Sequence, residues 1–200
     1  MSERKKIAVL VSGGGTNLQA LIDAQQAGQL GNGRLACVIS SRADAFALKR
    51  AKKAGIEALT LSAKFFPGEA YDRELVRLLK ERDIQLVVLA GFLRILGEQL
   101  IAAFSGRIVN VHPSLIPAFC GAGFYGLRVH EAALERGVKI TGATVHLVNG
   151  VVDGGPILLQ KAVEVVEGDT PETLQRRVME QAEWELLPRA VALLCTDEIR

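Results

Sequence analysis

Three side chains in the second half of the chain could together transfer a proton and stabilise an oxyanion. Asn110 and His112 lie in a short run of β-branched residues that Pro113 ends, because proline cannot donate to a strand ladder. Residues at i and i+2 of a strand share a face, so Asn110 and His112 should point the same way. Asp153 follows later in the sequence Asp-Gly-Gly-Pro. An amide, an imidazole and a carboxylate at one strand end suit acid–base chemistry and oxyanion binding.

The same residues also have an ordinary structural explanation. His112 could be a core histidine that bonds a backbone carbonyl, and Asp153 could make a turn. The residue types leave the two interpretations about equal, because the geometry that separates them is not visible in a sequence.

The elements that would position these residues alternate along the first half of the chain. Uninterrupted apolar strands separated by helices predict a parallel sheet covered on both faces, with right-handed crossovers. In such sheets ligands bind at the carboxyl ends of the strands. The expected strands are residues 7–12, 35–40, 58–61, 86–90 and 108–111, and the expected helices are residues 17–26, 43–54, 69–82 and 97–104.

The second half of the chain has a different pattern. A long loop over residues 112–125 precedes a helix over 127–136, and strands over 141–148 and 157–163 are joined by a short, turn-rich segment that predicts an antiparallel hairpin. A final helix covers about 170–194, and Pro188 could bend it. We expect one domain over residues 1–200, with a Rossmann-like, mostly parallel sheet flanked by helices.

Composition sets limits on the class of protein. The chain has 200 residues, 49% hydrophobic and 23% charged, with a net charge of +2. These values are typical of a globular enzyme and argue against a polybasic nucleic-acid surface. No apolar run approaches the roughly 18 residues that span a bilayer, so we expect a cytoplasmic protein without a membrane partner. Cys37 and Cys195 should be buried and Cys120 exposed, and no spacing indicates a metal site.

A glycine-rich segment follows the first strand and opens the first helix. In residues 12–17, Ser-Gly-Gly-Gly-Thr-Asn, backbone N–H groups and the helix N-terminus could bind an anion, with Gly15, Thr16 and Asn17 closest to it. Leu18 stands where a dinucleotide fingerprint needs its third glycine, so a phosphate monoester is favoured over NAD. The alternative is a tight turn in which Thr16 or Asn17 caps the helix.

Other polar residues receive structural interpretations. The cations Lys49, Arg50, Lys52 and Lys53 should stay solvated near a helix C-terminus and have no function. His130 should lie on the surface, and His146 should be a hydrogen-bonded supporting group. The segment 91–96 could line a flat pocket or form the first turn of a helix.

Six segments of the chain resemble the phosphoribosylglycinamide formyltransferase family. The resemblance runs in order over nearly the whole chain, and the glycine-rich segment favours this branch among the folate formyltransferases. The matching segments are Val-Ser-Gly-Gly-Gly-Thr-Asn-Leu-Gln (11–19), Ala-Tyr-Asp-Arg-Glu-Leu (70–75), Leu-Ala-Gly-Phe-Leu-Arg-Ile-Leu (89–96), Asn-Val-His-Pro-Ser-Leu-Ile-Pro (110–117), Gly-Ala-Thr-Val-His (142–146) and Asp-Gly-Gly-Pro-Ile-Leu (153–158).

The resemblance implies transfer of a formyl group from 10-formyltetrahydrofolate to the glycine amine of glycinamide ribonucleotide in purine synthesis, without a metal. His112 and Asn110 would donate to the oxyanion. Asp153 would favour protonated His112 and help to relay the proton. His146 would orient this group. By the same resemblance, Gly15, Thr16 and Asn17 hold the phosphate.

The resemblance also implies a folate pocket and an amine contact. The folate would be surrounded by Leu93, Arg94, Ile95, Leu96, Asn110, Asn149, Gly150, Val151, Val152 and Asp153. Glu183 would contact the amine, with Glu180 as an alternative because residues 178–188 are one residue longer than the family pattern, which could mean a helix bulge.

Two departures from the family pattern affect the edges of the site. Gly68 replaces an arginine near the folate tail, so the tail would be held differently. The loop over 118–129 is longer than usual and could act as a lid or a dimer contact, in a monomer or a homodimer.

The nearest alternatives are another folate formyltransferase and a formyltetrahydrofolate hydrolase, in which water replaces the amine. Alternatives of a different class are a non-catalytic nucleotide-binding module and an NAD-dependent oxidoreductase.

Overall fold

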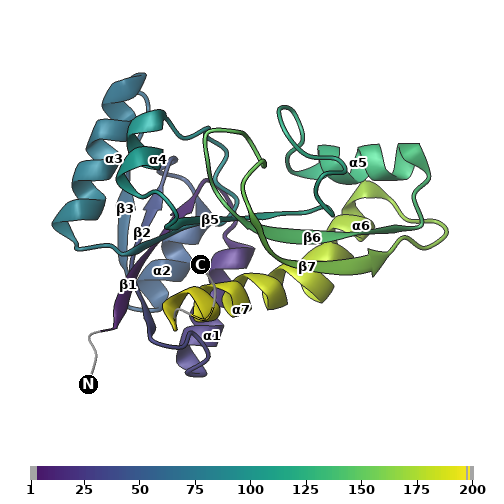
Figure 1. Cartoon of the computed structure of the whole chain (residues 1–200), viewed down its shortest axis with the longest axis horizontal. Helices are drawn as coiled ribbons and strands as arrows, with labels where there is room; N and C mark the ends of the chain where they lie inside the picture. Colours follow the sequence, from purple (N-terminus) through teal and green to yellow (C-terminus); the bar gives the residue numbers. More distant parts are fainter. Residues whose placement is uncertain (1–3, 197, 199–200) are drawn as a thin grey trace.

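The computed structural model describes residues 4–196 and 198, and these form one seven-stranded sheet with the order β3-β2-β1-β4-β5-β6-β7 (Figure 1). Strands β1 to β5 are parallel, and β6 and β7 run antiparallel beside β5. This mixed sheet confirms the predicted fold class. The strands are β1 (Lys5–Val11), β2 (Gly33–Ser40), β3 (Glu57–Thr60), β4 (Leu86–Leu89), β5 (Ile108–His112), β6 (Ile140–Leu147) and β7 (Ile157–Glu164).

Helices cover both faces of the sheet, as the apolar strands predict. The helices are α1 (Thr16–Gln26), α2 (Phe46–Lys53), α3 (Glu69–Glu81), α4 (Glu98–Ala103), α5 (Leu127–Arg136), α6 (Pro171–Val178) and α7 (Trp184–Cys195). Alternate residues of β1 enter two separate cores. Ile7 and Val9 belong to the core that also contains residues of α1, α2, α6 and α7, whereas Ala8 and Leu10 belong to the core that contains residues of α3 and α4. The strand period of two therefore explains the three-layer arrangement.

The strand order reverses between β1 and β4, which places two loops side by side. From β1 the chain moves outward to β2 and β3 and then returns to the other side of β1 as β4. The Ser12 N–H donates to the Gly91 carbonyl at 3.1 Å, and the Leu93 N–H donates to the Ser12 hydroxyl at 3.0 Å. The loops that follow β1 and β4 thus meet at the switch point, where open α/β sheets bind ligands.

The last helix is interrupted before Pro188. Residues Met179–Glu183 form a π-helical turn, η1, between α6 and α7, and the Trp184 N–H donates to the Met179 carbonyl. Such π-helical turns occur as single turns within α-helices, frequently at functional sites. The structure therefore contains a bulge in the segment for which the sequence predicted one. Within the part of the chain that the structure describes, no helix is both long and apolar enough to cross a bilayer.

Candidate active site

Asn110 and His112 extend from one face of β5 toward the same carboxylate. The Nδ1 atom of His112 lies 3.6 Å from Oδ2 of Asp153, and Nδ2 of Asn110 lies 3.5 Å from Oδ1 of Asp153. His112 is buried and the Asp153 side chain is nearly so. The structure therefore brings together the three side chains that the strand spacing and the Asp-Gly-Gly-Pro motif singled out.

Asp153 reaches this position because the loop between β6 and β7 folds back tightly. Its own φ of 54° is left-handed, a conformation that aspartate tolerates better than most residues. A Cβ on Gly155 would overlap the Leu147 carbonyl oxygen, so only glycine permits this close approach. The glycines of the motif thus give the loop a path that presents the carboxylate to β5.

His146 supports the cluster from the neighbouring strand, where it pairs with Asn110. Its Nδ1 lies 2.8 Å from the Leu147 carbonyl, which can only accept, so Nδ1 carries the hydrogen. The Nε2 atom accepts from Nδ2 of Asn110 at 3.2 Å, and it lies 3.5 Å from Oδ1 of Asp153. His146 therefore holds the Asn110 amide from the neighbouring strand and packs beside the carboxylate.

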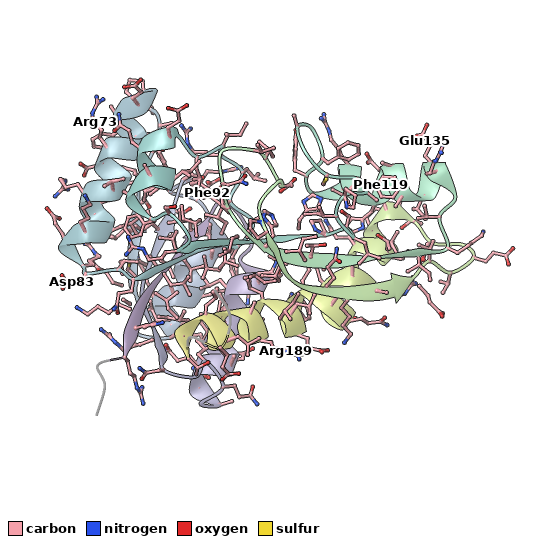
Figure 2. The ribbon with its side chains drawn as sticks, viewed as in Figure 1. Arg73, Asp83, Phe92, Phe119, Glu135 and Arg189 are labelled. Atoms are coloured by element: carbon pink, nitrogen blue, oxygen red, sulfur yellow. The ribbon has the colours of Figure 1, made fainter. Side chains whose placement is uncertain are left out.

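The segment between β5 and α5, residues 113–126, covers the cluster, and we call it the strap. Its Phe119 carbonyl accepts from Nε2 of His112 at 2.9 Å, and its Gly121 N–H donates to Oδ2 of Asp153 at 2.9 Å. Figure 2 labels Phe119 beside α5. One loop therefore holds both the imidazole and the carboxylate through main-chain groups. A backbone carbonyl partner for His112 is what the structural alternative predicted, but no residue pattern marks Phe119 as that partner or Gly121 as the donor to Asp153.

Burial and hydrogen bonding set the protonation of the two groups. Burial would raise the pKa of Asp153, but its contact with His146, the hydrogen bond from the Gly121 N–H and the nearby His112 ring lower it overall. Burial lowers the pKa of His112, against the opposing effects of the Phe119 carbonyl and Asp153. The expected effect of Asp153 on His112 is thus present but smaller than desolvation. At pH 7 His112 is neutral, with its hydrogen on Nε2.

The expectation that His130 lies on the surface is wrong, because its side chain is fully buried. It lies on α5, directly after the strap, and neither of its ring nitrogens has a hydrogen-bond partner among the described residues. Burial, followed by the proximity of His112, lowers the pKa of His130 to about 4. The sequence placed it near a helix start but could not show that this face of α5 packs inward.

The glycine-rich segment presents a helix terminus without a side-chain cap. Gly15 is the N-cap residue of α1, with a left-handed φ of 72°, and no side chain among the described residues bonds the first N–H groups. Neither Thr16 nor Asn17 caps the helix, so the alternative of an ordinary capped turn is wrong. The uncapped N–H groups suit an anion.

The side chains of Thr16 and Asn17 turn toward the last helical segment. Thr16 Oγ1 approaches the Met179 sulfur at 3.7 Å, and Asn17 Nδ2 donates to Glu183 at 2.6 Å. Glu183 is buried, whereas Glu180 is exposed. Burial, only partly offset by the Asn17 hydrogen bond, raises the pKa of Glu183 to about 7. The π-helical turn thus directs Glu183, not Glu180, toward the phosphate loop.

The residues expected around a folate lie on two loops that flank β5. Leu93 and Ile95 follow β4, Val151 and Val152 follow β6, and all four side chains are exposed, Ile95 by 77%. Asn149 and Gly150 are also exposed. Residues 91–97 contain no helical turn, so this segment is a loop. Exposed apolar side chains on both loops suit a flat, partly aromatic ligand.

Two members of that set differ from the rest. The Leu96 side chain is buried in the core beneath α3 and α4, so it does not line a pocket. The Arg94 guanidinium stacks over Tyr71 at 4.2 Å, and its Nε is buried without a partner among the described residues.

Gly68, which stands where relatives were expected to carry an arginine, is the N-cap residue of α3. Its φ of 55° is a conformation that favours glycine over arginine.

Sequence reasoning missed two groups near the phosphate loop. Ser12 bonds Ser41 at 2.7 Å and joins the loops that follow β1 and β4. Arg50 donates to the Gly14 carbonyl at 2.9 Å and to Gln19 at 3.0 Å, so it is not simply solvated. The sequence alone does not show that the first turn of α2 packs against Gly15, and this packing is what brings Arg50 to the loop.

Comparison with known proteins gives consistent matches. Residues 5–191 match the family described as formyl transferase. Phosphoribosylglycinamide formyltransferase of Escherichia coli (strain K12) is 44% identical over 176 residues, which are 88% of this chain and 80% of that protein. A crystal structure of glycinamide ribonucleotide transformylase 1 from Symbiobacterium toebii has a TM-score of 0.92 and 44% identity, covering 98% of this chain and 90% of that one.

A further relative is much longer. The trifunctional purine biosynthetic protein adenosine-3 of Drosophila pseudoobscura pseudoobscura is 45% identical over 199 residues, and the chain spans 14% of its length. The extent of the family match, together with the high coverage of the bacterial relatives, identifies the family. The chain belongs to the formyl transferase family.

Proposed function

We propose that the protein transfers the formyl group of 10-formyltetrahydrofolate to the amine of glycinamide ribonucleotide. The observation that carries this proposal is the convergence of Asn110, His112 and Asp153 at one strand end. The uncapped start of α1 lies at the neighbouring switch point of the same sheet. Relatives that carry this substrate in their names cover most of the chain.

The proposed reaction needs no covalent enzyme intermediate. The neutral amine attacks the formyl carbon, and the carbonyl oxygen gains a negative charge as the new C–N bond forms. His112 Nε2–H and the Asn110 amide donate to that oxygen, which lowers the energy of the tetrahedral intermediate. The bond to folate N10 then breaks. The proton lost by the amine passes through the Asp153 carboxylate to N10.

This chemistry requires a change of hydrogen-bond partner at His112. Its Nε2–H is bonded to the Phe119 carbonyl, so the strap must release it before the formyl oxygen can accept the same hydrogen. Asn110 must similarly give up its weak 3.5 Å contact with Asp153. A neutral imidazole can still donate, so the lowered pKa of His112 is compatible with the proposal.

The substrates fit on either side of this cluster in the proposed arrangement. The ribonucleotide phosphate lies on the N–H groups at Gly15, Thr16 and Asn17, with Glu183 facing the same substrate. The pterin lies between the exposed apolar side chains of the loops after β4 and β6. At the edge of this region the buried Arg94 Nε has no hydrogen-bond partner among the described residues, so it is a candidate donor to the folate.

A spectrophotometric assay of the donor, with and without glycinamide ribonucleotide, tests the proposal. Loss of formyl groups only in the presence of the ribonucleotide is the expected result. Donor breakdown without any acceptor would instead identify a hydrolase. No reaction in either case would refute both.

A further inference from the structure

Helix α2 contacts every glycine of the phosphate loop, although its residues lie thirty or more positions downstream. The Ala47 N–H donates to the Gly13 carbonyl at 3.1 Å. Arg50 Nε donates to the Gly14 carbonyl at 2.9 Å. A Cβ on Gly15 would lie 2.6 Å from the Ala47 Cβ. The first two turns of α2 therefore form a template for the loop.

These contacts fix the direction of the loop amides. In a trans peptide unit the C=O of one residue and the N–H of the next point in opposite directions. Because the carbonyls of Gly13 and Gly14 point toward α2, the N–H groups of Gly14 and Gly15 point away from it. Two consecutive amides are thus directed outward immediately before the uncapped start of α1. Successive N–H groups of this kind form an anion-binding concavity.

Arg50 is itself held in one position. Its guanidinium also donates to Gln19 Oε1 on α1 at 3.0 Å and stacks over the Phe46 ring at 5.1 Å. Among the described residues no carboxylate forms an ion pair with Arg50, so within this part of the chain its positive charge has no counter-charge. A planar fork with several donors can bond a carbonyl and an amide together, which the single ammonium of lysine does poorly.

We propose that Arg50 is a positioning residue for phosphate recognition: it orients the Gly14–Gly15 peptide toward the anion and adds a positive charge behind it. The inference rests on the proposed function in one respect, that the loop binds the phosphate of the acceptor substrate. It predicts that removing Arg50 weakens acceptor binding without affecting the donor or the chemical step.

The test compares Arg50→Gln and Arg50→Lys with Lys52→Gln, which removes an exposed charge from the same helix. We expect Arg50→Gln to raise KM for the ribonucleotide about tenfold, with kcat and the donor KM unchanged. Arg50→Lys should recover only part of this loss, since it restores the charge but not the fork. Lys52→Gln should behave as the wild type.

Binding of inorganic phosphate provides a readout that does not depend on the identity of the acceptor. Trp184 is the only tryptophan and lines a groove together with Thr16 and Arg50, so its fluorescence can follow the titration. The dissociation constant of phosphate should rise in Arg50→Gln by the same factor as KM. If the protein uses a different phosphorylated acceptor, the formyl-transfer assay fails but this shift remains.

Three results would overturn the inference. The first is an unchanged phosphate affinity in Arg50→Gln, and the second is no phosphate binding by the wild type. The third is an equal rise of both KM values together with a lower Tm, which would assign Arg50 a purely structural role.

Discussion

The phosphate loop and the Asn110–His112–Asp153 cluster lie at the same edge of one sheet but are built from different parts of the chain. The phosphate loop uses main-chain amides between β1 and α1, held from behind by α2. The cluster uses side chains from β5, β6 and the loop between β6 and β7, and the strap covers it. The amides of the phosphate loop point outward, whereas the His112 and Asn110 donors of the cluster already have hydrogen-bond partners within the protein.

This difference separates binding from chemistry. Amides that point outward need no rearrangement to receive an anion, so changes in the phosphate loop should appear in KM. Donors that must exchange partners act only as the reaction proceeds, so changes in the cluster should appear in kcat.

The largest expected effect is on turnover in the cluster. His112→Ala and Asp153→Asn should each lower kcat by about a hundredfold or more, the range for acid–base and oxyanion groups, with little change in KM for the ribonucleotide. Steady-state kinetics with each substrate varied in turn would measure this. Asp44→Asn, an exposed carboxylate, is the control. Near-normal kcat in either variant would exclude that residue from the mechanism.

Two buried groups, His130 on the helix after the strap and Glu183 beside the phosphate loop, should change the stability of the fold with pH in opposite directions. Buried His130 has its pKa lowered to about 4, so on acidification the unfolded chain takes up a proton that the folded chain does not. Its contribution to stability is lost as the pH falls from about 6.5 to 4, and the loss is at most about 3 kcal/mol. Glu183, with a pKa raised to about 7, favours the protonated form when folded. Stability is lost there as the pH rises from about 4.5 to 7.

Urea unfolding across this range separates the two groups. Relative to the wild type, His130→Leu should gain stability as the pH falls, and Glu183→Gln should gain stability as it rises. Glu180→Gln is the matched control, because Glu180 is exposed on the same helical turn. Profiles that stay parallel to the wild type would contradict the assigned burial effects.

A smaller effect is expected in the backbone of the phosphate loop. Gly15→Ala places a Cβ against Ala47 at a φ of 72°, which should cost about 1–3 kcal/mol of unfolding free energy and raise KM for the ribonucleotide. Gly14→Ala is the control for packing, because a Cβ there meets no atom within 4 Å. Equal stability of the two variants, measured by urea unfolding, would show that the loop adapts.

The smallest effect is expected at the proposed folate surface. Ile95→Ala should raise the donor KM a few-fold by removing apolar contact, and leave KM for the ribonucleotide unchanged. Ile140→Ala, an exposed isoleucine at the start of β6, controls for the loss of surface area. A rise in both KM values would argue against a separate folate surface.

The sequence is informative wherever a periodic pattern or a glycine requirement determines the structure. The alternation in β1, the spacing of Asn110 and His112, and Gly155 in its motif all predict what the structure contains. The failures involve tertiary packing. His130 lies on a helix whose inward face no local pattern marks, and Arg50 resembles its solvated neighbours until α2 is placed against the loop. The predicted single domain over residues 1–200 and the roles of individual site residues stay predictions.

The π-helical turn also bears on how such a chain can change length during evolution. An added residue in an α-helix rotates everything beyond it by about 100°. Leu174 and Val178 before the π-helical turn and Leu186 and Leu187 after it all lie in the core. A wide turn at this point would therefore let one residue be gained or lost without repacking either helix. The turn also positions the Glu183 carboxylate, which accepts a hydrogen bond from Asn17 of the phosphate loop. A change of length at the turn would therefore also change which groups Glu183 contacts.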